Sequence, residues 1–168
     1  MINWHTFPKS AQTTPTVVAV VKAFEKNDKS ISSESNQLPS DGVLRELRTD
    51  LESIGFQIEK DKTSEGKIKL PVLFGLNGKV EKSFEADGYH PGEKIVLEVE
   101  AGRGVTNYQF LKDLFQACMM QNAEHLVVSV RNDYRGSGDF AKVVNFFETL
   151  YASGRLTLPL ASITIIGY

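Results

Sequence analysis

Apolar residues recur at helical spacing in the first third of the chain. They predict a helix from Pro15 to about Asn27, with Thr14 as N-cap and Pro15 at the first helical position. Residues 27–42 are rich in Ser and Asn and lack periodicity, so we expect a mobile loop there. A second helix should follow and end at Gly55, with apolar positions at Leu44, Leu47, Leu51 and Ile54.

The pattern then changes to the alternation that is typical of strands. A short strand is expected at 56–59, and an antiparallel meander over 72–74, 80–88 and 94–100. A helix should begin at a capping box formed by Thr106 and Gln109. A buried strand (125–130), a helix (139–152) and a last strand (163–166) complete the chain. This order predicts an α/β fold, a three-layer α/β/α sandwich on a mixed sheet.

Length and composition indicate an ordinary globular chain. Its 168 residues predict a single domain over 1–168, in which 1–42 form an N-terminal helix plus a loop and 43–168 form the core. The net charge of −2 argues against bulk attraction to nucleic acid but leaves room for a local basic groove. A single cysteine excludes a disulfide framework. Without a membrane-length apolar run or a signal peptide, we expect a cytoplasmic protein with no membrane partner.

Candidate chemistry lies on the strand 94–100. Side chains alternate between the faces of a strand, so Glu98 and Glu100 share a face. If the turn closes over Pro91-Gly92 or over 90–93, Asp87 faces Val96 and lies diagonal to Glu98. Glu85 shares the face of Asp87. Such carboxylates repel one another unless a cation offsets their charge, and oxygen ligands suit Mg²⁺ or Mn²⁺.

A solvated outer face of a hairpin would explain the same acidic spacing. The position of the strand favours the other interpretation. A helix and a buried strand follow 94–100 directly, so this strand should be central and covered on both faces, and covered charges need partners.

The segments Val96-Leu97-Glu98-Val99-Glu100-Ala101-Gly102-Arg103 and Tyr108-Gln109-Phe110-Leu111-Lys112-Asp113-Leu114-Phe115, with Asp87 before them, resemble the core of PD-(D/E)xK nucleases. The closest resemblance is to BamHI- and BglII-type restriction enzymes, and it covers residues 43–132. It implies a restriction-endonuclease-like core (αβββαβ) with an extra C-terminal helix and strand. It further implies Mg²⁺-dependent hydrolysis of DNA by an endonuclease.

In that family pattern Asp87 and Glu98, assisted by the Val99 carbonyl, would hold Mg²⁺ or Mn²⁺. The metal would polarise the phosphate and activate water, and Glu100 would orient or deprotonate that water. The family usually has Lys where this chain has Glu100. Glu100 is therefore a base, a second metal ligand or neither, and a catalytically silent module that binds a nucleic-acid or protein partner is the alternative function.

Further candidates are basic residues that could contact phosphate or DNA: Lys94, Arg103, Lys112, Arg131 and Arg135. For the first three a solvated surface charge is the favoured interpretation, and for Arg131 and Arg135 the two interpretations are equally supported. Glu46, on the flank of the second helix, is either an additional metal ligand or solvated. Cleavage of both strands would require two sites, so we expect a homodimer. The helix from Asn107 could supply part of its interface through Phe110, Leu114 and Met120.

Overall fold

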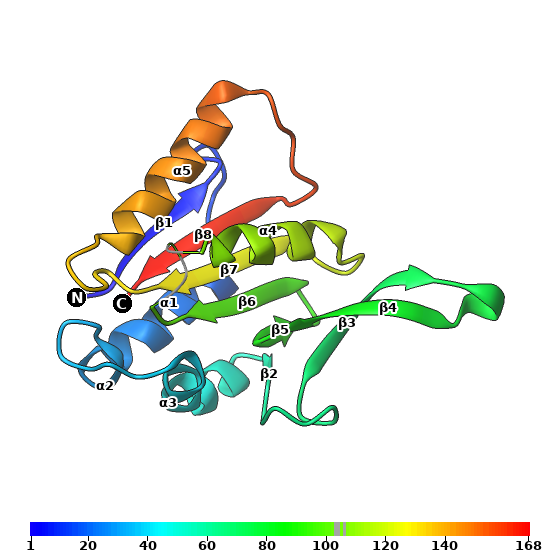
Figure 1. Ribbon diagram of the computed structural model, residues 1–168, viewed down its shortest axis with the longest axis horizontal. Coiled ribbons are helices and arrows are strands. Elements are labelled where there is room, and N and C mark those ends of the chain that lie inside the picture. Colours follow the sequence, from blue (N-terminus) through cyan, green and yellow to red (C-terminus); the bar gives the residue numbers. More distant parts are fainter. Residues whose placement is uncertain (103–104, 106) are drawn as a thin grey trace.

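The structure, a computed structural model, describes residues 1–102, 105 and 107–168 (Figure 1). Its main sheet has six strands in the order β1-β8-β7-β6-β5-β2, and β3 pairs with β4 in a separate two-stranded sheet. The strands are β1 (Asn3–Phe7), β2 (Gln57–Ile58), β3 (Ile68–Phe74), β4 (Val80–Ala86), β5 (Gly88–His90), β6 (Ile95–Glu100), β7 (His125–Val130) and β8 (Ser162–Gly167).

Strands β6, β7 and β8 run parallel, whereas β1, β5 and β2 join the sheet antiparallel. The α-helices in the described residues are α1 (Pro15–Lys26), α2 (Asp28–Ile31), α3 (Ser40–Ser53), α4 (Gln109–Met119) and α5 (Asp139–Ser153), and Leu76–Gly78 form a short 3-10 turn, η1. The chain therefore has a mixed α/β fold on a mixed sheet, as the sequence predicts.

Helices cover both faces of the sheet (Figure 1). On one face Ile95, Leu97 and Val127 pack in a buried cluster with residues of α1 and α3. On the other face Val96 and Val128 pack with residues of α4 and α5. The central strand β6 is thus covered on both sides, which confirms the predicted alternation of its side chains.

The local sequence explains where the first helices begin and end. The Thr14 side chain accepts a hydrogen bond from the Val17 N–H (3.3 Å), and Pro15 occupies the first position of α1. Gly55 follows α3 with a φ of 102°, a conformation that favours glycine. The start of α1 and the end of α3 therefore lie where the sequence predicts them.

Three predictions about the order of elements were wrong. Residues 3–7, for which no strand was expected, form β1 and pair with β8. The expected loop 27–42 contains the short helix α2, whose Ile31 is buried, and includes the start of α3. The expected strand 80–88 is divided at Asp87 into β4 and β5, which belong to different sheets.

The division at Asp87 lets β3 and β4 leave the main sheet as a projecting hairpin (Figure 1). Exposed apolar residues lie near its far end: Leu73, Phe74, Leu76 and Val80. Among the described residues, no helix has both the length and the apolar character needed to cross a membrane.

Helix α4 presents the opposite face from the one expected for an interface. Phe110, Leu114 and Met120 are buried in the core, where they cover β6 and β7. The exposed apolar residues of this helix are Phe115 and Met119, with 54% and 48% of their surfaces accessible. The predicted contribution of Phe110, Leu114 and Met120 to a dimer interface was therefore wrong. A capping role of Thr106 falls outside the described residues.

Candidate functional site

Asp87 lies where the chain passes from the hairpin into the main sheet, directly after Ala86 of β4 and before Gly88 of β5. Gly88 pairs with Leu97, so the next step of the ladder brings Asp87 beside Glu98. The connection to β6 is a four-residue loop over 91–94, not a loop over Pro91-Gly92 or 90–93. The predicted pairing of Asp87 with Val96 was wrong by one step along the face, and Asp87 lies closer to Glu98 than expected.

A small cavity joins these residues to the helix that follows β6. It has a volume of about 210 Å³ and is lined by the acidic residues Glu59, Glu85, Asp87, Glu98, Glu100 and Asp113. Its basic lining residues are Lys62, Lys67 and Lys112. Strand β6 supplies Glu98 and Glu100, and α4 supplies Asp113 from its buried face. Five elements or loops therefore bring charged side chains to one place.

Burial changes the ionisation of the two central carboxyl groups. Burial raises the pKa of Asp87 to about 6, although the hydrogen bond from the Val99 N–H (2.8 Å) opposes that rise. Glu98 is 8% exposed. Burial, then repulsion from Asp87, Asp113 and Glu100, raises its pKa well above the ordinary range. A cation between Asp87 and Glu98 would remove this repulsion.

Glu100 and Asp113 form a hydrogen-bonded pair of carboxyl groups. Burial, followed by the charge of Glu100, raises the pKa of Asp113 to about 8. Burial also raises the pKa of Glu100, but the hydrogen bond from Asp113 opposes that rise. No donor from the described part of the chain reaches Asp113 Oδ2. We expect Asp113 to be the protonated member at neutral pH, donating to the Glu100 carboxylate, because its pKa is raised to about 8.

The donor set partly fits a divalent cation. All candidate ligands are carboxylate oxygens, and the buried Glu98 faces other acids, which is the arrangement that a hard cation stabilises. Yet no group of three or more His, Cys, Asp and Glu side chains within residues 1–102, 105 and 107–168 is arranged to hold a metal ion. Mg²⁺ commonly uses one or two carboxylates and completes its shell with water and substrate phosphate. Asp87 and Glu98 satisfy that smaller requirement.

The structure brings together some of the predicted residues but not others. Asp87, Glu98, Val99, Glu100, Lys112 and Glu85 line the cavity, and Glu85 is ion-paired with Lys67. The Val99 N–H donates to Asp87, and the Val99 carbonyl as a metal ligand stays a prediction. Glu46 is exposed on α3 and does not line the cavity. Lys94, at the other end of β6, pairs with Glu124 (2.6 Å).

Of the three predicted arginines, Arg131 and Arg135 do not line the acidic cavity. Arg131 is buried, donates to the Leu38 carbonyl (2.9 Å) and stacks on Tyr134, which gives it a structural role. Arg135 also lies over the Tyr134 ring, beside a separate cavity of about 630 Å³ at the end of β7. Arg103 lies outside the described residues.

Four charged cavity residues were missed from the sequence: Glu59, Lys62, Lys67 and Asp113. A signal for Asp113 was present, because this acid sits at helical spacing among Phe110, Leu114 and Ala117, which form the buried face of α4. A carboxylate within an apolar stripe needs a partner. Glu59 and Lys62 lie beyond the two-residue strand β2, where no periodicity points to a shared site.

Comparison with known proteins leaves the site to be interpreted from its chemistry. The chain matches no protein-family model, and it matches no curated protein sequence.

Proposed function

We propose that the protein is a divalent-metal-dependent endonuclease that hydrolyses phosphodiester bonds of DNA on a restriction-endonuclease-like core. The observation that carries this proposal is the position of Asp87 beside the buried Glu98, in a cavity that also contains Glu100. The order of α3, the strands up to β6, α4 and β7 supports that core, with α5 and β8 as the C-terminal addition.

Asp87 and Glu98 would hold Mg²⁺ or Mn²⁺. The bound ion would polarise the phosphate and make a water more acidic at neutral pH. Glu100 would orient the attacking water or accept its proton. The hydrogen bond from Asp113 favours the ionised form of Glu100, which this role requires. Lys112, at the rim of the cavity, offsets part of the negative charge that a phosphate meets there.

Incubation of the purified protein with supercoiled plasmid and Mn²⁺ tests this function. Asp87→Asn and Glu98→Gln keep the shapes of the side chains but remove their charges, so cleavage should be lost in both. Glu148→Gln, on the exposed face of α5, is the matched control and should cleave as the wild type does. Equal cleavage by all four proteins would indicate a contaminating nuclease and refute the proposal.

A catalytically silent binding module is the second candidate. It is favoured by the absence, within the described residues, of a three-ligand metal group and by the Glu100–Asp113 pair, which lowers the charge of the cavity without a cation. Titration calorimetry with Mn²⁺ separates the two functions. The nuclease binds Mn²⁺ through Asp87 and Glu98, whereas the silent module shows no binding that these substitutions remove.

A homodimer forms part of the same proposal, since cutting both DNA strands requires two sites and a two-fold dimer is the simplest way to supply them. Exposed Phe115 and Met119 of α4 support an apolar contact between copies. Met119 also lines a groove of about 650 Å³ between α4 and the β3–β4 hairpin.

A further inference from the structure

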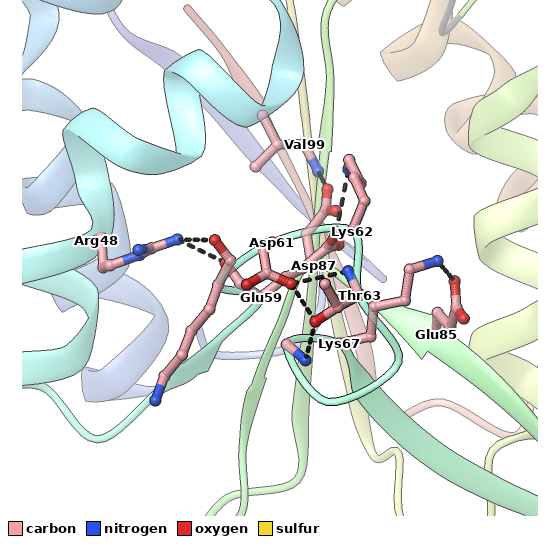
Figure 2. A network of polar contacts seen from close by, with 11 residues as sticks. Arg48, Glu59, Asp61, Lys62, Thr63, Lys67, Glu85, Asp87 and Val99 are labelled. Carbon is pink, nitrogen blue, oxygen red and sulfur yellow. Dashed lines mark hydrogen bonds and ion pairs between the residues drawn. The ribbon is translucent and has the colours of Figure 1, made fainter.

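Lys62 extends from the loop between β2 and β3 to the edge of the carboxylate cavity (Figure 2). Its Nζ lies 3.2 Å from Oε1 of Glu59, whose side chain is 10% exposed. Lys62 and Asp87 also line a second cavity of about 260 Å³, which has Arg45, Arg48 and Lys60 among its lining residues. This second cavity has as many acidic as basic lining residues, and Lys62 lies between it and the more acidic first cavity.

The loop that carries Lys62 is fixed to the site by its backbone. The Glu59 N–H donates to the Asp87 carbonyl (2.8 Å), and the Arg48 guanidinium donates to the Glu59 carbonyl (2.7 Å). The Lys60 N–H donates to the Gly66 carbonyl (2.8 Å) and closes the loop. Figure 2 shows this network between α3, the loop and Asp87. The backbone around Lys62 is thus held in place, and its side chain, 71% exposed, is accessible to a ligand while it pairs with Glu59.

The other lysines of the cavity are placed differently. Lys67 is ion-paired with Glu85 on the hairpin. Lys112 is 60% exposed, and its Nζ lies 4.0 Å from Asp113. The charge of Lys62 favours the ionised form of Asp87, whereas that of Lys112 acts on Glu98 and Glu100. A negatively charged phosphate that approaches Asp87 and Glu98 therefore meets the ammonium of Lys62.

We propose that Lys62 contacts the scissile phosphate, and that Glu59 holds its ammonium beside Asp87 until the phosphate arrives. This inference rests on the proposed nuclease function and deepens it, since it names a residue of the same site. A phosphodiester carries one negative charge, and hydrolysis adds a second as water attacks. An ammonium placed beforehand stabilises the more highly charged transition state more strongly than the bound substrate.

Substitution of Lys62 separates contact with phosphate from a structural role. Lys62→Met should lower the rate of DNA cleavage by about 10²-fold or more, as the loss of one electrostatic contact in a transition state does. Lys62→Arg keeps the charge and should restore most of the rate. Lys69→Met is the matched control: its ammonium contacts Ser64 of the same loop, but it lines neither cavity, and its rate should equal that of the wild type.

Calorimetry with Mn²⁺ in the absence of DNA gives a readout independent of cleavage. Removing a cation beside the carboxylates should leave Mn²⁺ binding by Lys62→Met intact or tighter. A wild type that cleaves, together with a Lys62→Met variant that cleaves within about threefold of it, would overturn the role of Lys62 alone. Loss of Mn²⁺ binding in Lys62→Met would overturn it too, because the lysine would then be structural. A wild type that neither cleaves nor binds Mn²⁺ would overturn the proposed function and this inference together.

Discussion

The backbone N–H of Val99 donates a hydrogen bond to Oδ2 of Asp87 over 2.8 Å. This hydrogen bond connects Asp87, which lies between the two sheets, to β6, a central strand of the larger sheet. A backbone donor therefore orients one oxygen of the Asp87 carboxylate. The second oxygen of Asp87 is then the one placed to bind a ligand from the cavity.

Without divalent cations, the protein should become less stable as the pH rises from about 4 to about 8. The pKa of Asp87 rises from an ordinary 3.8 to about 6 in the folded protein, and that of Asp113 rises to about 8. The folded state therefore binds more protons than the unfolded chain in this range, so increasing pH favours unfolding. Thermal unfolding in a chelating buffer at pH 5 and pH 8 measures the effect as a lower Tm at pH 8.

Mg²⁺ should raise the Tm at pH 8 and have little effect at pH 5, where protons already neutralise the carboxyl groups. The double variant Asp87→Asn/Asp113→Asn removes two of the groups and should flatten the profile in the chelating buffer. A Tm that rises between pH 5 and pH 8 in that buffer would contradict the assignment of these pKa shifts.

Asp113→Asn should extend cleavage to higher pH. The Asp113 carboxyl donates to Glu100 while it is protonated, and it loses that proton near pH 8 because burial and the charge of Glu100 set its pKa there. The amide of Asn donates at every pH, so the rate should persist above pH 8, where the wild type declines. Asp113→Leu removes the donor and should lower the rate by about tenfold or more at pH 7. Identical pH–rate profiles for the three proteins would show that Asp113 does not act on Glu100.

The sequence predicts the layers of the fold better than its edges. The stripes of α1 and α3 and the alternation of β6 arise from residues that each bury a whole face, so their periodicity is clear. Asn3–Phe7 is too short and too polar at its start to be distinguished from an irregular end, and β8 completes it through distant pairing. Asp87 lies between two sheets because the β3–β4 hairpin leaves the main sheet at this residue. The alternation of apolar and polar residues continues through 80–88 and does not predict this break.

The residues of β6, Asp87 and Lys112 were predicted for the candidate site, whereas those of the loop between β2 and β3 were missed. The alternation of side chains along a strand predicts that Glu98 and Glu100 share a face. Because the strand is covered on both faces, their charges need a partner, and this indicates a site. Lys62 reaches the cavity through a loop whose course depends on hydrogen bonds from Arg48. Lys94 precedes β6 and has a φ of 53°, so the alternation of the strand does not reach it, and its side chain pairs with Glu124 away from the acids.

Phe115→Ser and Met119→Ser should weaken the proposed dimer. Both residues expose about half of their surface on α4, and a serine removes the apolar area that association would bury. Sedimentation velocity over a range of protein concentrations should show a shift towards monomer for the double variant. Leu156→Ser, at an equally exposed apolar residue after α5, is the control and should sediment as the wild type does. A wild type that remains monomeric at the highest concentration would remove the dimer from the proposal.

Phe7→Ala should show that β1 is an integral part of the core. Phe7 is 1% exposed, and its ring stacks on Phe147 (5.9 Å between centroids) and Tyr151 (5.7 Å) of α5. Truncation of a buried aromatic side chain typically costs about 3–5 kcal/mol of unfolding free energy. Trp4→Ala, on the same strand but 40% exposed, should cost much less. Urea denaturation followed by circular dichroism measures both, and equal losses would mean that β1 pairs with β8 without packing against α5.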